Sequence, residues 1–211
     1  MAAFEADQTV AQIDGLHFSY PHRPLFTDWS ARFPAGLSCI LGDEGSGKST
    51  LLRLLAGDMQ AQGGHLQVAG VSLEQDASAY RALVFRTDPK SEMPKDQTPL
   101  QWLQGQQARY PGFDMAAVPA LLAQLHLDQH QNKPMFMLST GSRRKVWLVA
   151  AFASGAALTL IDQPFAALDK ASIVAALALL RTASSEPGRA CVVADYELPH
   201  GLVLAQTLML D

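Results

Sequence analysis

The sequence is poor in cysteine, with two in 211 residues. Cys39 and Cys191 each lie in a short apolar run, and cysteine is among the most buried residue types. We therefore predict two buried thiols in strands, because a disulfide would need an oxidising compartment. The first ten residues also lack a basic stretch followed by an apolar run, so no secretory signal is expected there.

Basic charge is scarce as well. Lysine and arginine total 16 against 20 aspartates and glutamates, which gives a net charge of −4. The basic residues are scattered, except at Arg143-Arg144-Lys145. A nucleic-acid-binding surface normally carries a basic stripe. We therefore expect no nucleic acid among the partners of this protein.

Long apolar runs are missing too. The longest, Val146 to Ile161, is shorter than the roughly 20 residues needed to cross a bilayer, and Ser154-Gly155 interrupts it. This run predicts a buried helix that ends near Gly155, followed by a buried strand. We expect a cytoplasmic protein that meets the inner face of a membrane through a partner.

What the sequence does contain is a large apolar fraction, 48%, which is typical of a single globular domain over residues 1–211. Apolar runs of strand length alternate with segments of helical spacing, and this alternation predicts an α/β fold with a parallel sheet. Strands are predicted at residues 9–20, 29–41, 66–73, 83–85, 158–161, 191–194 and 207–210. Turns are predicted at residues 21–24 and 34–36, and helical segments at residues 48–56, 98–131, 139–152 and 171–183.

The segment from Gly42 to Ser49 matches the phosphate-loop pattern G-x-x-x-x-G-K-[ST] at every fixed position. It lies between an apolar strand and an amphipathic helix, a context in which main-chain N–H groups and a helix N-terminus hold phosphate oxygens. In such a loop Lys48 would reach the β- and γ-phosphates, and the Ser49 hydroxyl would bind Mg²⁺. The residues predicted here to bind ATP are Gly42, Asp43, Glu44, Gly45, Ser46, Gly47, Lys48, Ser49 and Thr50.

A second candidate metal ligand ends another apolar strand. Leu158 to Ile161 is followed directly by Asp162. The carboxyl ends of parallel strands form the edge of a sheet where ligands bind. Asp162 and Ser49 are therefore predicted to hold Mg²⁺ together.

The order of these motifs resembles the ATPase domain of ABC transporters over nearly the whole chain. Tyr20 matches the aromatic residue that stacks on adenine in that family. Leu138 to Ser142 resembles the family signature LSGGQ, and Asp169 lies in Ala167-Leu168-Asp169, which resembles the D-loop. The signature residues, which in the family act on ATP held by the opposing subunit, would be Ser139, Thr140, Gly141 and Ser142.

The resemblance implies a P-loop NTPase fold with a RecA-like parallel sheet, an N-terminal antiparallel β portion and an inserted helical subdomain. The expected core is residues 1–88 and 151–211, and the expected helical subdomain is residues 89–150. It also implies ATP and Mg²⁺ as cofactors, a homodimer or heterodimer with another ABC-type subunit, and a membrane-spanning partner. The segment with Pro89 and Pro94 lies where family members contact that partner.

The chain departs from the family at three positions that concern hydrolysis. Gln163 stands where the family has glutamate, and a neutral amide can orient water but cannot act as a base. Arg86, followed by Thr87, stands at the place of a glutamine that contacts metal and water. Asp195 or Tyr196 stands at the place of a histidine near the γ-phosphate, and His200 is too far along the chain to replace it.

A lone Gln163 would also fit a change engineered to trap ATP, but three departures together favour a natural site with slow hydrolysis. The leading interpretation is an ATP-binding subunit of an ABC transporter. The alternatives are a soluble regulatory or scaffold module that uses ATP to hold a dimer, a degenerate half of a heterodimer, and a small-molecule kinase, which explains neither the signature nor the D-loop.

Other residues are interpreted structurally. His126 and His130 have the spacing of a shared helix face, and with no third ligand nearby they predict a solvated face rather than a metal site. Arg143-Arg144-Lys145 is interpreted mainly as surface, with a contribution to phosphate in the partner's site as the alternative. The three tryptophans are predicted to lie in the core or between subdomains; they are Trp29, Trp102 and Trp147.

Overall fold

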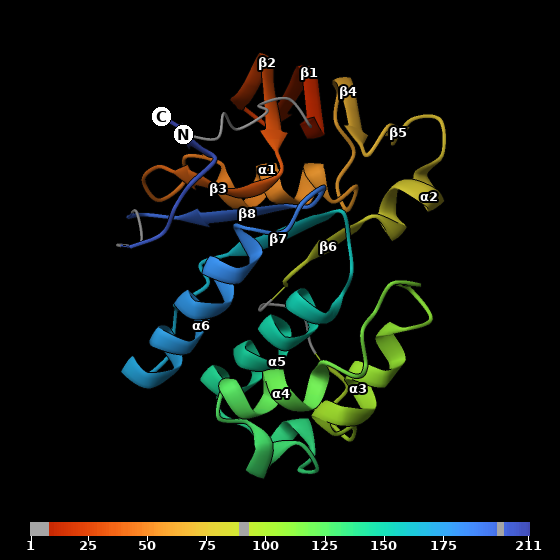
Figure 1. Cartoon of the computed structure of the whole chain (residues 1–211). Helices are drawn as coiled ribbons and strands as arrows, with labels where there is room; N and C mark the ends of the chain where they lie inside the picture. The colour runs from red at the N-terminus through yellow and green to blue at the C-terminus, as the bar shows by residue number, and fades with distance from the viewer. Residues whose placement is uncertain (1–8, 89–92, 198–200) are drawn as a thin grey trace, which may run out of the picture.

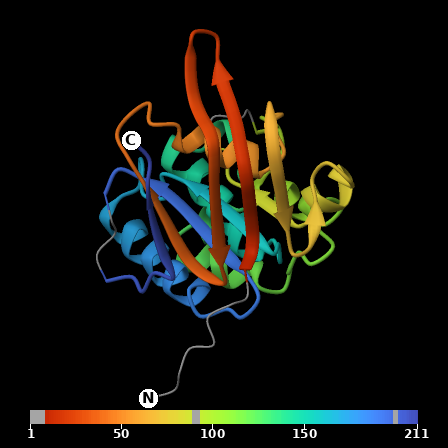
Figure 2. The same cartoon turned by 90° about the horizontal axis from the view of Figure 1, so that it is seen from above.

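The computed structural model describes residues 9–88, 93–197 and 201–211, and these residues form layers that Figure 1 shows from the side. The first layer is an antiparallel sheet of four strands. In spatial order they are β2 (Arg23–Pro34), β1 (Thr9–Tyr20), β4 (Gly63–Val68) and β5 (Val71–Ser72). Seen from above in Figure 2, these strands cross over the rest of the molecule at an angle.

The second layer is a parallel sheet of five strands. In spatial order they are β6 (Val84–Arg86), β7 (Leu158–Asp162), β8 (Ala190–Asp195), β3 (Gly36–Leu41) and β9 (Gln206–Met209). The β3 strand pairs with β8 on one side and β9 on the other, although both come from far along the chain. Because all pairs are parallel, the carboxyl ends of β3, β7 and β8 meet at one edge.

The helices lie around this parallel sheet. Figure 1 shows α1 (Lys48–Leu55) between the two sheets and α5 (Thr140–Ala153) and α6 (Lys170–Ala183) on the opposite side of the parallel sheet. A short helix, α2 (Ala77–Ala82), precedes β6. The segment between β6 and α5 holds α3 (Pro99–Gln106), α4 (Val118–Gln124) and the 3₁₀ turns η1 (Asp128–His130) and η2 (Met135–Met137).

The central strands β3, β7 and β8 are mostly apolar because both of their faces are covered. Successive side chains of a strand point to opposite faces. In β8, Val192 packs with α1 and the antiparallel sheet, whereas Cys191 and Val193 pack with the helices on the other face. In β7, Leu160 and Ile161 divide between the two faces in the same way. The sheet therefore separates two hydrophobic cores.

The predicted fold class is confirmed, and both cysteines are buried thiols in strands, as expected. Trp29, Trp102 and Trp147 are partly buried and pack against the cores. None of the helices in the described ranges is long and apolar enough to cross a bilayer. The proposed subdomain boundaries stay predictions.

Several predicted elements were wrong in extent. The β2 strand begins at Arg23 rather than residue 29, because it pairs with β1 almost to the hairpin turn. Residues 66–73 form parts of two strands joined by a turn at Ala69 and Gly70, and residues 98–131 form two separate helices and a 3₁₀ turn. The helix α2 was not predicted.

The histidine prediction was also wrong. His126 lies beyond the end of α4 with a φ of 56°, and His130 lies in η1, so the two do not share a helix face. Within the described ranges, no three or more of the His, Cys, Asp and Glu side chains lie together as a metal site.

Candidate functional site

A cleft with a volume of about 910 Å³ lies at the carboxyl edge of the parallel sheet. The phosphate-loop segment and α1 line one side of it, and residues from the ends of β6 and β7 line the centre. Arg144 and Trp147 of α5 contribute from the helical side. Most of the residues predicted to bind ATP therefore lie around one cleft.

The loop between β3 and α1 needs glycine at two places. A Cβ atom on Gly42 would lie 2.3 Å from the main-chain oxygen of Leu210, which is impossible without moving that strand end. Gly47 is the N-cap of α1 with a φ of 102°, in the left-handed region, and it has no side chain to cap the helix. The loop thus leaves the N-terminal end of α1 open toward the cleft.

Lys48 is the first residue of α1 and is only 6% exposed. Its ammonium group donates hydrogen bonds to the main-chain oxygens of Gly42 and Asp43, the latter at 2.8 Å. The ring of Tyr196 lies 4.4 Å from the ammonium nitrogen. The lysine side chain is therefore folded along the loop that the sequence pattern assigns to phosphate.

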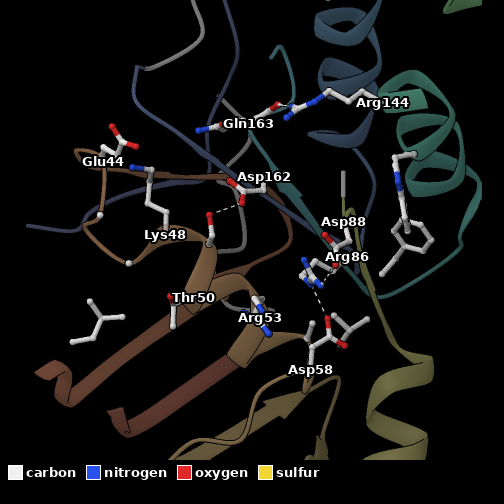
Figure 3. Close-up of a pocket in the computed structure, with 18 of the residues that line it drawn as sticks. Glu44, Lys48, Thr50, Arg53, Asp58, Arg86, Asp88, Arg144, Asp162 and Gln163 are labelled. Atoms are coloured by element: carbon white, nitrogen blue, oxygen red, sulfur yellow. Dashed lines mark hydrogen bonds and ion pairs between the residues drawn. The ribbon is translucent and has the colours of Figure 1, made fainter. Parts of the chain in front are cut away.

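Ser49 and Asp162 come together from opposite halves of the chain. The Ser49 hydroxyl donates to Oδ2 of Asp162 at 2.6 Å, so two hard oxygen ligands lie side by side next to Lys48. Figure 3 shows Asp162 between Lys48 on one side and Arg86 on the other. Mg²⁺ prefers carboxylate, hydroxyl and phosphate oxygens, and these residues fit a magnesium ion that also binds a polyphosphate.

A buried polar atom in the loop also fits a phosphate group. The Ser46 side chain is 8% exposed, and its hydroxyl has no hydrogen-bond partner among the described residues. Buried polar groups are normally paired, so an unpaired hydroxyl in this loop is consistent with a ligand oxygen beside it.

Gln163 follows Asp162 directly and has a φ of 49°, which is unusual for a residue other than glycine. Its N–H donates to the main-chain oxygen of Ala194 at 2.8 Å, and its own main-chain oxygen accepts from Nη1 of Arg144 at 3.2 Å. Its main chain is thus fixed by β8 on one side and α5 on the other. The side chain of Gln163 lines the cleft.

Arg144 was interpreted as surface or as a residue of the partner's site, but it lies in the cleft of its own chain, as Figure 3 shows. Arg143 donates to the main-chain oxygen of Leu138 at 2.9 Å, and Lys145 is buried, so the surface interpretation was wrong for this segment. The sequence held no signal for the contact between Arg144 and Gln163, which joins residues 19 apart.

Arg86 lines the cleft with its guanidinium group held by acids. It donates to Asp58 at 2.7 Å and to Asp88 at 2.9 Å, and its side chain is 13% exposed. Burial lowers its pKa, but the hydrogen bonds to Asp58 and Asp88 outweigh burial and raise it. Thr87 is buried, and its hydroxyl accepts from the N–H of Asp162 at 3.3 Å.

Of the two candidates at the end of β8, Tyr196 lines the cleft, whereas Asp195, the last residue of β8, is half-buried and is not among the lining residues. Oδ1 of Asp195 accepts a hydrogen bond from the N–H of Tyr196 at 2.8 Å. Burial raises the pKa of Asp195; the Tyr196 N–H opposes this shift and the nearby Asp162 carboxylate adds to it. Pro89 and His200 lie outside the described residues.

The predicted adenine side of the cleft holds Tyr20, whose hydroxyl lies 3.1 Å from Oγ1 of Thr50. Two residues that sequence reasoning missed lie beside it. Arg23 donates to the main-chain oxygen of Gly45 at 2.9 Å, and the Leu25 side chain lies 3.0 Å from the position of a Cβ atom on Gly47. Arg23 pairs with Tyr20 across the hairpin. This pairing was not expected, because residues 21–24 were predicted to be a turn.

The described residues that line this cleft do not include the signature segment, residues 139–142. Ser139 is the N-cap of α5, and its hydroxyl accepts from the N–H of Ser142 at 3.0 Å. A Cβ atom on Gly141 would lie 2.5 Å from the main-chain oxygen of Ala167. The start of α5 therefore packs directly on the segment before α6, a helix that Asp169 caps. Both segments lead into helix N-termini that polar side chains cap, Ser139 on α5 and Asp169 on α6.

Comparisons with known proteins agree with this geometry. A family model described as ABC transporter matches residues 30–166. The taurine import ATP-binding proteins TauB of Escherichia coli O157:H7 and Shigella flexneri are each 28% identical over 209 residues, which span 94% of this chain and 78% of the relative.

Solved structures share the fold. One described as the ATP binding subunit of an ABC transporter superposes with a TM-score of 0.81 at 23% identity, covering 90% of this chain and 80% of the other. A bacterial Atm1-family ABC exporter with ATP bound also gives 0.81 at 21% identity, covering 99% of this chain and 38% of the exporter.

Proposed function

This chain belongs to the ABC transporter family, as an ATP-binding subunit, and we propose that it binds Mg²⁺-ATP in the cleft at the edge of its parallel sheet and hydrolyses it slowly. The observation that carries the proposal is the contact at 2.6 Å between Ser49 and Asp162, at the open end of α1 and next to Lys48. In this arrangement Lys48 and the loop would hold the phosphates, and Ser49 and Asp162 would hold the metal ion. The metal, when bound, would neutralise charge on the phosphate oxygens.

Isothermal titration calorimetry of the purified chain with Mg²⁺-ATP tests the binding. We expect saturable heat from the wild type and none from Lys48→Ala, because that variant loses the cation of the loop. Lys133→Ala is the matched control, since Lys133 is an exposed lysine outside the cleft. Absence of heat with the wild type, or equal binding by Lys48→Ala, would contradict the proposal.

Slow hydrolysis is supported by three side chains, one through its chemistry and two through their contacts. Gln163 cannot accept a proton from water, and Arg86 is bound to Asp58 and Asp88. Tyr196, rather than a histidine, lies next to Lys48. A general base typically contributes about 10²–10⁴-fold to a rate, so its loss alone would leave hydrolysis weak. Steady-state phosphate release at rates typical of active ABC subunits would disprove slow hydrolysis.

Family members of this kind pair with membrane components of a transporter. We propose that two such ATP-binding chains close on ATP, with Ser139, Thr140, Gly141 and Ser142 acting on ATP in the opposing subunit. Closure would then move a membrane partner, which would contact the segment around Pro94. Copurification with a membrane-spanning protein when both are expressed together tests this part of the proposal.

A second candidate function is a module in which ATP holds a dimer without being consumed. The ion pairs of Arg86 with Asp58 and Asp88 favour this candidate. Arg86 stands where the family has a glutamine that contacts metal and water, and the ion pairs hold its side chain on the two carboxylates instead. Analytical ultracentrifugation with and without Mg²⁺-ATP separates the cases. A stable ATP-dependent dimer with no membrane partner supports this candidate, and a dimer formed only with a second ABC-type chain supports the heterodimer.

A further inference from the structure

Tyr196 lies against the lysine of the phosphate loop. The Lys48 ammonium nitrogen is 4.4 Å from the centroid of the Tyr196 ring, within the range of a cation–π contact. On its other sides the ammonium donates to the main-chain oxygens of Gly42 and Asp43. Two carbonyl groups and one aromatic face therefore surround a cation that is 6% exposed.

The sheet places this ring beside the loop. The parallel pairing of β3 with β8 sets Leu41 opposite Asp195, so the next residues, Gly42 and Tyr196, leave the sheet side by side. The Asp195 carboxylate accepts from the N–H of Tyr196 at 2.8 Å and anchors its main chain. The Tyr196 side chain is 49% exposed, so its ring has room to turn away while its backbone stays fixed.

We propose that the Tyr196 ring competes with nucleotide phosphate for the ammonium group of Lys48 and thereby lowers the phosphate affinity of the site. The inference rests on the proposed binding of Mg²⁺-ATP. A phosphate oxygen accepts a charge-assisted hydrogen bond from an ammonium group, and such a bond is stronger than a cation–π contact at a half-exposed site. Phosphate therefore displaces the ring, and the lost cation–π contact is subtracted from the binding free energy.

Two substitutions separate the aromatic face from the bulk of the side chain. Tyr196→Leu keeps an apolar side chain and removes the π face, whereas Tyr196→Phe keeps the π face and removes the hydroxyl. We expect Tyr196→Leu to bind Mg²⁺-ATP about two- to fivefold more tightly than the wild type, as a cation–π contact of about 0.5–1 kcal/mol implies at 1.4 kcal/mol per tenfold. Tyr196→Phe is expected to bind as the wild type does.

Calorimetry with Mg²⁺-ATP and with Mg²⁺-tripolyphosphate measures both variants. Because competition acts on phosphate, the gain for Tyr196→Leu should be equal for the two ligands, although tripolyphosphate has no base. A purely structural role would instead lower the midpoint of urea unfolding and weaken binding in the leucine variant. Equal or weaker binding by Tyr196→Leu, or the same gain with Tyr196→Phe, would overturn the competition.

The wild-type titration distinguishes this failure from failure of the proposed function. If the wild type binds Mg²⁺-ATP and the leucine variant gains nothing, the competition alone is wrong. If the wild type binds neither ligand, nucleotide binding fails and the competition fails with it.

Discussion

Position 163 holds a glutamine whose main chain is fixed at both ends, by Ala194 through its N–H and by Arg144 through its carbonyl. A carboxylate placed there would therefore lie close to the same point in the cleft as the amide does. Whether a base at this point is sufficient for hydrolysis depends on the residues around it.

We predict that Gln163→Glu raises phosphate release by less than about tenfold, well below the 10²–10⁴-fold typical of a general base. The reason is that Arg86 stays bound to Asp58 and Asp88 and so does not contact water at the metal. Steady-state phosphate release with excess Mg²⁺-ATP measures the effect, with the wild type alongside. An increase of several hundredfold would mean that the glutamine alone limits the reaction.

The carboxyl group of Asp195 is predicted to lower the stability of the protein at neutral pH. Burial raises its pKa in the folded state, and the Asp162 carboxylate adds to this shift, so ionisation is less favourable in the folded than in the unfolded chain. Below the unfolded pKa of about 3.9 the carboxyl group is neutral in both states and takes nothing from the free energy of unfolding. As the pH rises through the folded pKa, this part of the stability is lost.

Asp195→Asn should accordingly raise the midpoint of urea unfolding at pH 7, and this difference should shrink as the pH falls toward 4. The asparagine oxygen can still accept the hydrogen bond from the Tyr196 N–H. Asp96→Asn, at an exposed aspartate outside the cleft, is the control. A difference that is constant with pH would show that ionisation is not its cause.

At the scale of elements, the start of α5 is joined to the segment before α6 by a contact that leaves no space for a side chain. Gly141→Ala would place a Cβ atom 2.5 Å from the carbonyl oxygen of Ala167, a residue that already has a φ of 60°. We predict a loss of about 1–3 kcal/mol in the free energy of unfolding, as for other overpacked sites.

Gly105→Ala in α3 is the matched control, because nothing lies within 4 Å of the Cβ position and the residue is helical. It should stabilise the protein by about 0.5–1 kcal/mol, since alanine loses less conformational entropy in a helix than glycine does. Urea denaturation of both variants gives the two values. Equal effects at Gly141 and Gly105 would argue against a tight contact at Ala167.

Elements with two covered faces could be predicted from the sequence, because β3, β7 and β8 are mostly apolar along their length. Elements defined by their pairing could not. The proline at position 24 suggested a turn, but β2 begins at Arg23. Across the hairpin Arg23 pairs with Tyr20 and Pro24 pairs with Ser19, so this segment is already part of the strand. The helix α2 is short and buries one side chain, Tyr80, so its apolar signal was weak, although Asp76 caps it and could have indicated its start.

The candidate site shows the same division. Lys48, Ser49 and Asp162 could be brought together from motifs, since the pattern specifies their spacing and their strand ends. The partners of Arg86 and Arg144 depend on side-chain packing between distant elements, which no local pattern records. Similarly, it could not be predicted that Tyr196 lines the cleft and Asp195 does not, because this depends on the register of β8 on β3.

At the scale of the whole molecule, the two cysteines report on the same core, on the helix side of the parallel sheet, because Cys39 pairs with Val193 and Cys191 pairs with Leu37. Cys39 lies in β3, and burial, with a contribution from Asp195, raises its pKa to about 11. Burial raises the pKa of Cys191 in β8 to about 12. Since the thiolate is the reactive form, neither should react with a thiol reagent at pH 8 while the protein is folded.

We predict that labelling with a chromogenic disulfide reagent is slow in buffer and complete, at two thiols per chain, in concentrated urea. The labelling rate across a urea series should follow the unfolding curve measured by circular dichroism. Rapid labelling of either thiol in buffer would show that the core on the helix side of the sheet opens without global unfolding.

The position of β3 between β8 and β9 has a consequence for protein synthesis. The phosphate loop emerges from the ribosome early, but both neighbours that hold its strand in place are translated long afterwards. A nascent chain halted before β8 would carry the complete loop sequence and still lack the sheet edge that shapes it. Nucleotide binding should therefore begin only after residues far downstream have been translated and have folded back onto the first part of the chain.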